Sequence, residues 1–347
     1  MNPSAAEHPA VVFRLGHMGD VALATGVLSH WFERTGQPFV FATREANLPL
    51  LANHPAVAGT IGLSKADLTD AGWLRRTGEL ARQYAGGTLI DLHGTLRSRI
   101  LALRWKGPVR RYPKFGLARR LFERTRSDRF RAKLEALNVP QRYALALDRA
   151  APEREAVLPR VYLTEDETRA AERRLSPISC EGPRVALHPY ATHPSKQWPA
   201  ENWIRLAALL DAEDINWFVV GRSVAPLTSG HERDLTNQTD LRATCGLLAR
   251  ADLLVTGDSG PMHLACGVGT PVVALFGPTA KAWGFYPAGP KDVVLERDLP
   301  CRPCSLHGAG KCTRGFECMT ETTPETVLDA VRASLARSVR PAFNDPS

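Results

Sequence analysis

Short apolar runs alternate with longer amphipathic stretches along most of this chain, and this alternation restricts the possible folds more than any other feature. The apolar runs of the first half are residues 10–15, 38–42, 59–63 and 88–92. Those of the second half are residues 184–188, 216–220, 253–256 and 271–276. Helical patterns separate them, at residues 21–34, 67–84, 201–210 and 241–250. Alternating strands and helices predict the α/β class, with parallel sheets that carry helices on both faces.

The length of the chain predicts two such domains. At roughly 100–200 residues per domain, 347 residues suffice for two full hydrophobic cores. We place the domains at 1–160 and 161–347, and the second ends with a Cys-rich loop at 301–318 and a C-terminal helix. Open α/β domains bind ligands at the carboxyl ends of their strands, so the expected site is a cleft across which the two domains face each other.

Composition excludes several other classes. Hydrophobic residues make up 44% of the chain and charged residues 23%, which is ordinary for a globular protein and argues against global disorder. No apolar run reaches the ~18–20 residues that a membrane helix needs, and Met1–Ala10 does not have the pattern of a secretory signal. Seven Cys are too few for a disulfide scaffold. We therefore expect a cytoplasmic protein.

The positive charge of the chain is concentrated in one segment. The net charge is 44 − 36 = +8, but Arg97–Lys133 alone contains fourteen basic residues and two acidic ones, 14 − 2 = +12. We expect this segment to be helical in pieces and to meet an anionic partner such as phosphate or a membrane surface. Without a recognised nucleic-acid motif, nucleic acid is not the expected partner. A solvated arginine-rich helix face remains the alternative.

A glycine-rich turn links the first strand to the first helix. Gly16-His17-Met18-Gly19-Asp20 places a carboxylate at the carboxyl end of the strand, where Asp20 is a candidate general base. Asp is also a favoured residue at helix N-termini, so a purely capping role for Asp20 is the alternative.

Two loops of the second half carry groups suited to phosphate. The loop 188–199 offers the hydroxyl of Thr192 and the ammonium group of Lys196. The stretch 256–265 is a strand, a glycine-rich turn and a helix start with Pro261. Backbone N–H groups around Ser259, Gly260 and Met262 would form an anion site at the N-terminus of that helix.

These motifs, in this order, resemble the family 9 glycosyltransferases, the heptosyltransferases of bacterial lipopolysaccharide core assembly. The matching stretches are residues 13–20, 196–199, 257–265 and 269–279. The resemblance implies the GT-B architecture, with two Rossmann-like domains: the acceptor would bind to the first and the nucleotide-sugar to the second. One departure is Ala191, where some members have a second Thr.

The resemblance also implies roles for individual residues. Asp20 matches the family's catalytic base, and Lys196 matches the residue that faces the donor diphosphate. The positions expected to bind the donor are Thr192, Asp258, Ser259, Gly260, Met262 and His263. Acceptor-binding positions are expected in the basic segment, at Arg97, Arg119, Arg120 and Arg124.

A cluster of cysteines lies near the C-terminus, at Cys301, Cys304, Cys312 and Cys318. Four thiolates can form a tetrahedral site for zinc or iron, so these cysteines are candidate ligands of a structural metal. A related autotransporter heptosyltransferase group holds iron in this region. The alternative is a set of reduced structural thiols.

The expected function is therefore inverting transfer of a heptose from a nucleotide-sugar, ADP-heptose, to an anionic lipid-linked core acceptor, with no cofactor required for catalysis. Such an enzyme would associate reversibly with the inner face of the bacterial inner membrane. Two alternatives stay open: a family 9 enzyme with another donor sugar or a protein or other glycan acceptor, and a non-catalytic module that binds nucleotides or anions.

Overall fold

The computed structural model describes residues 9–178, 181–304, 308 and 312–337 of the chain. The chain forms two compact units. Unit 1 runs to Tyr162 and includes the later segment Ala282–Phe285, whereas unit 2 contains Leu163–Lys281 and the chain from Tyr286 onward. In the described ranges, no helix has both the length and the apolar character to cross a membrane.

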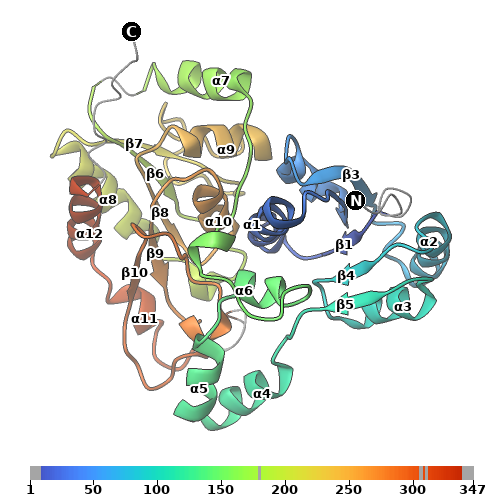
Figure 1. Cartoon of the computed structure of the whole chain (residues 1–347). Helices are drawn as coiled ribbons and strands as arrows, with labels where there is room; N and C mark the ends of the chain where they lie inside the picture. The colour runs from blue at the N-terminus through green and yellow to red at the C-terminus, as the bar shows by residue number, and fades with distance from the viewer. Residues whose placement is uncertain (1–8, 179–180, 305–307, 309–311, 338–347) are drawn as a thin grey trace. The chain divides into compact units, whose positions relative to one another are not determined.

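Unit 1 is built on a five-stranded sheet in the order β3-β2-β1-β4-β5, with every neighbouring pair parallel (Figure 1). Its strands are β1 (Val11–Phe13), β2 (Phe39–Arg44), β3 (Val57–Leu63), β4 (Leu89–Asp91) and β5 (Val109–Arg111). Its helices are α1 (Met18–Thr35), η2 (Glu45–Leu51), α2 (Asp70–Gln83), α3 (Leu96–Arg104), α4 (Gly116–Thr125), α5 (Asp128–Glu135), α6 (Val139–Ala144) and η3 (Glu155–Val157).

Unit 2 has a second parallel sheet, in the order β10-β9-β8-β6-β7. Its strands are β6 (Arg184–His188), β7 (Asn216–Val219), β8 (Leu253–Gly257), β9 (Val272–Phe276) and β10 (Val293–Glu296). Its helices are α7 (Glu165–Leu175), η4 (Pro194–Lys196), α8 (Ala200–Asp211), α9 (Leu241–Ala249), α10 (Gly260–Gly267), α11 (Glu317–Thr320) and α12 (Pro324–Ala336), while η5 (Lys281–Trp283) bridges the unit boundary.

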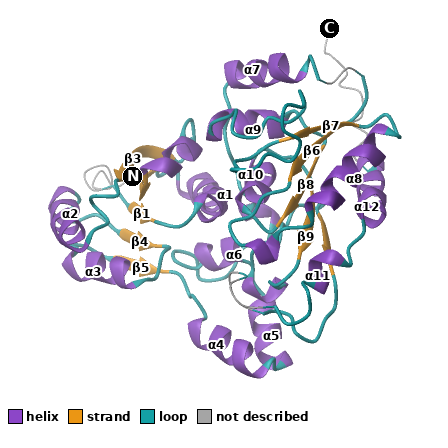
Figure 2. Ribbon diagram, turned by 180° about the vertical axis from the view of Figure 1, so that it is seen from behind, coloured by secondary structure: helices purple, strands orange, loops and turns teal. Residues whose placement is uncertain are grey.

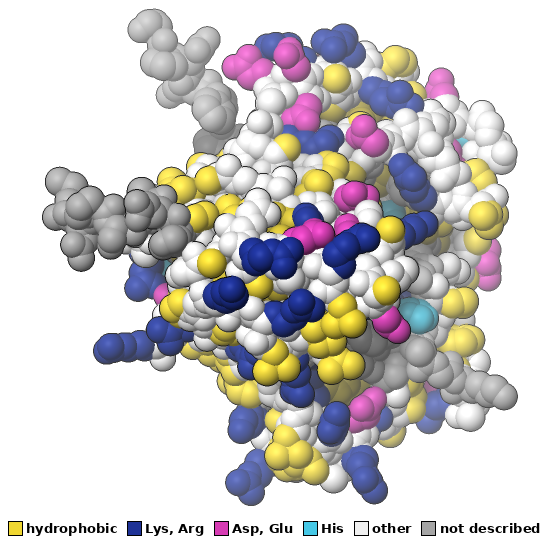
Figure 3. All heavy atoms as spheres, turned by 90° about the vertical axis from the view of Figure 1, so that its right-hand side faces the viewer, with side chains coloured by type: hydrophobic (Ala, Val, Ile, Leu, Met, Phe, Trp, Pro, Cys, Tyr) yellow, Lys and Arg dark blue, Asp and Glu magenta, His cyan; other side chains and the backbone are white. Residues whose placement is uncertain are grey.

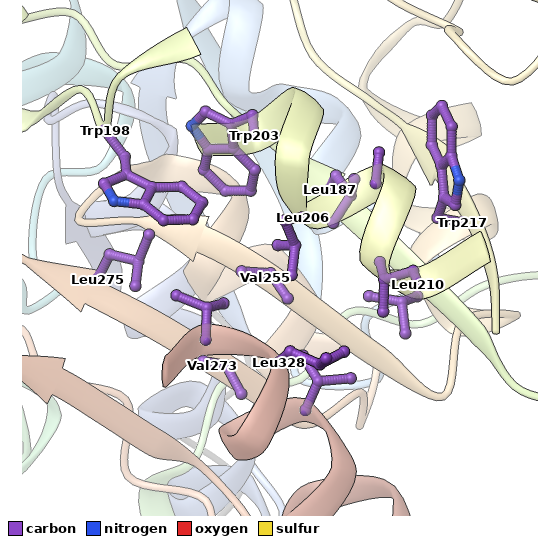
Figure 4. Packing of buried hydrophobic residues seen from close by; sticks show 14 of the residues in the cluster. Leu187, Trp198, Trp203, Leu206, Leu210, Trp217, Val255, Val273, Leu275 and Leu328 are labelled. Atoms are coloured by element: carbon purple, nitrogen blue, oxygen red, sulfur yellow. The ribbon is translucent and has the colours of Figure 1, made fainter. Parts of the chain in front are cut away.

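Helices lie on both faces of each sheet (Figure 2), as the alternating pattern predicts. On one face of the unit 2 sheet, β6, β8 and β9 pack against α8 and α12 through a core of buried side chains (Figure 4). Trp198 and Trp203 meet edge to face at 5.1 Å in this core. The Trp198 indole also donates to the Thr322 carbonyl at 2.8 Å, which anchors the loop that carries Lys196.

In each sheet the strand order reverses at one point. In unit 1 this point lies between β1 and β4, and in unit 2 between β6 and β8. Loops leave such neighbouring strands in opposite directions, which opens a crevice at their carboxyl ends. The loops after β1 and β4, and those after β6 and β8, are therefore the places where each unit can bind a ligand.

The structure corrects the sequence analysis at the sheet edges. Part of the basic segment, expected to be helical in pieces, forms β5, an edge strand of the unit 1 sheet. An edge strand of the unit 2 sheet, β10, was not expected. β5 is three residues long and two of them are exposed arginines, so it lacks the apolar run of a central strand. Short, charged edge strands of this kind resist pairing with other chains.

Candidate active site

The first part of the site lies at the carboxyl end of β1, where α1 begins. Asp20 is the third residue of α1, and its Oδ2 accepts a hydrogen bond from the His17 backbone N–H at 3.2 Å. Its Oδ1 pairs with Nη2 of Arg14 at 2.5 Å. A Cβ at position 16 would stand 2.2 Å from Oδ2, so only glycine leaves room for this carboxylate. The arrangement fixes Oδ1 of Asp20, whereas Oδ2 has, among the described residues, the one backbone contact from His17.

Arg14 connects this carboxylate to the loop after β4. Its Nη1 donates to the Leu92 carbonyl at 3.1 Å and to Nδ1 of His93 at 3.2 Å, and the guanidinium lies over the Tyr143 ring. Burial, together with the Arg14 charge, lowers the pKa of His93 to about 4. His93 is therefore neutral at pH 7, and its Nδ1 can accept the hydrogen bond. Arg14, which follows β1, thus contacts the loop that follows β4, and these are the two strands between which the strand order of unit 1 reverses.

Positive charge exceeds negative charge around this point. Lys114 Nζ lies 3.4 and 3.3 Å from the carbonyl oxygens of His93 and Gly94. Burial, and then repulsion by Arg14, lowers the pKa of Lys114, and burial likewise lowers that of Arg119. Among the described residues, the buried Arg119 Nε has no hydrogen-bond partner, and no carboxylate forms an ion pair with Lys114 or Arg119. This surplus of cations can bind an anion.

The second part of the site lies at the reversal point of unit 2. Lys196 Nζ and Asp258 Oδ2 are 2.6 Å apart, although 62 residues separate them in sequence. Their side chains are only 14% and 13% exposed. The Thr279 hydroxyl donates to the same carboxylate oxygen at 2.8 Å. Strand order explains the contact, because β6 and β8 are neighbours and the loops that follow them carry the two charges.

A buried histidine organises the turn before α10. His188 Nδ1 lies 3.1 Å from the Thr256 hydroxyl and 3.2 Å from the Ser259 hydroxyl. Burial lowers the pKa of His188 to about 4, so the ring is neutral at pH 7. Ser259 is the N-cap residue of α10 and is followed by Gly260. His188 thereby holds the Ser259 hydroxyl beside the backbone N–H groups of a helix N-terminus.

The remaining residues predicted for the donor differ in exposure. Met262 and His263 are buried in α10, so Met262 can offer a ligand only its backbone N–H. Thr192 is exposed on the loop after β6. Their roles stay predictions.

The four arginines predicted for the acceptor do not lie together. Arg119, on α4, is the one that shares the electrostatic environment of Arg14 and Asp20. Arg120 and Arg124 are exposed on the same helix. Arg97 lies on α3, where its guanidinium donates to the Leu68 carbonyl at 2.6 Å and holds α3 against the loop before α2. The basic segment is continuous in sequence, but its helices direct these side chains to different places.

All four cysteines of the C-terminal cluster lie among the described residues. In the described ranges, no group of three or more His, Cys, Asp or Glu residues is arranged to hold a metal ion. The four thiols are nevertheless neighbours: burial raises the pKa of Cys318 to about 11, and the other three thiols add to that shift. Backbone N–H groups of Arg314 and Phe316 donate to the Cys312 sulfur at 3.4 and 3.2 Å. As placed, the thiols do not form the expected site, and metal binding stays a prediction.

Several residues of both parts were missed from the sequence. Arg14, His93, His188 and Thr279 each end a strand or follow it by one to three residues. The rule that ligand-binding groups follow parallel strands would have found them. Lys114 follows edge strand β5, so its role could not be found before that strand was recognised.

Comparison with known proteins gives a family. The model of glycosyltransferase family 9 (heptosyltransferase) matches residues 75–309. Over 166 residues the chain is 28% identical to lipooligosaccharide heptosyltransferase 2 of Campylobacter jejuni, a match covering 44% of this chain and 51% of that protein. The chain thus spans about half the length of this and similar curated relatives.

Solved structures share the fold over nearly the whole chain. A family 9 glycosyl transferase from Veillonella parvula has a TM-score of 0.76 at 19% identity, covering 95% of this chain and 98% of the other. The ADP-heptose lipopolysaccharide heptosyltransferase II of Escherichia coli has a TM-score of 0.70 at 22% identity, with 96% and 100% covered. Together with the two parallel sheets, these likenesses confirm the predicted GT-B fold class.

Proposed function

Because the chain belongs to glycosyltransferase family 9, we propose that it transfers a heptose from ADP-heptose to a lipopolysaccharide-core acceptor with inversion at the anomeric carbon. The names of the Campylobacter and Escherichia coli proteins support the sugar, the nucleotide and the class of acceptor. The observation that carries the proposal within this chain is the Arg14–Asp20 pair at the carboxyl end of β1.

Asp20 acts as the general base in this scheme. Arg14 holds Oδ1, so Oδ2 is the atom that receives the proton of the acceptor hydroxyl. The acceptor oxygen forms a bond to the anomeric carbon of the heptose while the bond from that carbon to the diphosphate oxygen breaks, and ADP leaves with the electron pair. A single displacement of this kind inverts the anomeric centre.

The leaving diphosphate gains negative charge, which unit 2 can stabilise. Lys196 supplies a point charge, and the N-terminus of α10, with Ser259 held by His188, supplies backbone N–H groups and the helix dipole. Asp258 and Thr279 hold the Lys196 ammonium group in place. In this scheme the chain's own cations serve the leaving group, and catalysis requires no added cofactor.

The cations around Asp20 indicate an anionic acceptor. Lys114 and Arg119 would bind a carboxylate or phosphate of the acceptor next to the reacting hydroxyl, and such a group would relieve the repulsion between these cations. Because core acceptors are carried on a lipid, we place the enzyme in the cytoplasm with reversible association to the inner membrane.

The test is turnover of ADP-heptose with a core acceptor by Asp20→Asn and by Asp70→Asn. Asp70 is a matched control, since it is an exposed Asp in the first turn of α2. Asp20→Asn should lower kcat by about 10²–10⁴-fold with ADP binding unchanged, while Asp70→Asn stays near wild type. Near-normal kcat in Asp20→Asn would reduce Asp20 to a helix cap. Absence of wild-type turnover with every nucleotide-sugar offered would favour the non-catalytic module.

A further inference from the structure

Helix α3 turns hydrophobic side chains to the outside of unit 1. Leu96 is 74% exposed and Leu103 is 86% exposed. Positions 96, 99, 100 and 103 follow the spacing of one helix face, and they hold Leu, Arg, Ile and Leu. The opposite face is buried through Ser98 and Leu101. A helix whose inner face is already packed has no structural need for an outer leucine stripe.

The stripe lies within a basic environment. Arg99, Arg104, Lys106 and Arg110 are exposed on α3, on the turn after it and on the edge strand β5, and no described carboxylate pairs with any of them. The α2 side adds Leu74, which is 52% exposed and whose carbonyl accepts a hydrogen bond from Arg104 at 2.6 Å. Figure 3 looks at the side of unit 1 where α2 and α3 lie in Figure 1, and there Lys and Arg side chains alternate with hydrophobic ones.

We propose that this face, Leu74, Leu96, Arg99, Leu103 and Lys106, binds the surface of an anionic lipid bilayer. The leucines would enter the boundary between headgroups and acyl chains, and the basic side chains would contact lipid phosphates, with their methylene stems lying along the apolar layer. The inference deepens the proposed function by giving the surface through which the chain meets a lipid-borne acceptor, although its test needs no turnover.

Charge distinguishes a bilayer from other occupants. A second copy of the chain docked on the same face would bring this positively charged patch against an identical one, which is unfavourable for a self-complementary interface. A bilayer rich in anionic lipid instead offers negative charge at every lateral position together with an apolar layer below it. The face is also firmly held, because Arg97 and Arg104 bind backbone carbonyls of Leu68 and Leu74. It can therefore dock without being ordered first.

The experiment is sedimentation with vesicles of phosphatidylcholine, with and without about one-third phosphatidylglycerol. Each basic residue at an anionic surface is worth roughly a factor of five in binding, so Arg99→Glu/Lys106→Glu should weaken binding to anionic vesicles by at least tenfold. Leu96→Ser/Leu103→Ser should weaken it by about tenfold or more. The control Ile204→Ser/Val224→Ser alters exposed apolar residues of unit 2 and should stay within about twofold.

Equal binding by the wild type and the two test variants, or binding indifferent to phosphatidylglycerol, would overturn the inference. The inference would also be overturned if the wild type were a dimer in gel filtration and Leu96→Ser/Leu103→Ser a monomer, because this face of α3 would then bind a second copy of the chain. Circular dichroism and ADP affinity show that each variant is folded. Turnover of a lipid-free acceptor fragment should be retained in both test variants, so failure of the docking inference and failure of the transferase proposal give different results.

Discussion

Replacement of Lys196 separates its structural role from its role toward the donor. In Lys196→Met, Asp258 loses its ammonium partner and, among the described residues, keeps the Thr279 hydroxyl bond; in the wild type its side chain is 13% exposed. Removing one partner of a buried ion pair costs 3–5 kcal/mol, and we expect about 3 kcal/mol because water still reaches this pair. For a unit of this size, that corresponds to a Tm lower by about 6–12 °C.

The double variant Lys196→Met/Asp258→Asn should recover most of this loss, because no uncompensated charge stays buried. We expect it within about 1 kcal/mol of wild type. ADP affinity should behave differently. It should fall by about tenfold or more in both the single and the double variant, since each lacks the ammonium group that would contact the diphosphate. Thermal unfolding gives the first quantity and calorimetric titration of ADP gives the second.

The exposed pair Arg205–Glu325 in the same unit supplies a control, and Arg205→Met should change stability by less than about 1 kcal/mol. A double variant as unstable as Lys196→Met would refute the argument from buried charge. Wild-type ADP affinity in Lys196→Met would refute contact with the diphosphate and would leave the pair a structural link between two loops.

Three further expectations follow from the site and the cysteines. Charge reversal at Arg119, Arg120 and Arg124 should raise the acceptor KM and flatten its salt dependence, with the donor KM unchanged; a change in donor KM instead would contradict acceptor binding. The pKa of His188 is about 4 in the fold against an ordinary 6.5, so the unfolded chain takes up the proton first. Unfolding free energy should therefore fall as the pH drops from 6.5 to 4, by up to about 3 kcal/mol, and less so in His188→Asn, as titrated by denaturant. Elemental analysis of protein purified without added metal tests the cysteine cluster. About one zinc or iron per chain, lost in Cys304→Ser, would support a structural site, whereas metal-free protein would show that the four cysteines are reduced thiols.

The periodicity of the sequence predicted the two sheets because central strands are uniformly apolar and helices keep one polar face. It failed at β5, which has one apolar residue and two exposed arginines, and at β10, a four-residue strand without a buried position. Motif position predicted that Lys196 and Asp258 act in one region, but not that they touch. That contact depends on β6 and β8 being neighbours, which no local pattern of residues encodes.

Arg97 and Arg119 show the same limit within one basic segment. Both are arginines near the start of short helices, and the sequence gives no reason to separate them. The two side chains differ because of how their helices pack. Helix α3 lies against α2, and Arg97 donates to the Leu68 carbonyl, whereas Arg119 is close enough to Arg14 for the two charges to repel each other. Charge composition therefore marks a basic segment without showing which of its members share a site, and the role of this segment toward the acceptor stays a prediction.

Unit 1 takes a piece of its interior from the far half of the chain. Trp283 is buried against the Phe122 ring at 5.7 Å, its carbonyl accepts from Arg142, and Gly284 accepts from the Val139 N–H. A fragment cut after Tyr162 would expose that aromatic surface and leave the buried guanidinium short of acceptors. Unit 1 is therefore incomplete without the segment Ala282–Phe285. A chimera that joins residues 1–162 to the donor-binding half of another protein should fold only if that half supplies a segment equivalent to Ala282–Phe285, with a tryptophan that packs on Phe122.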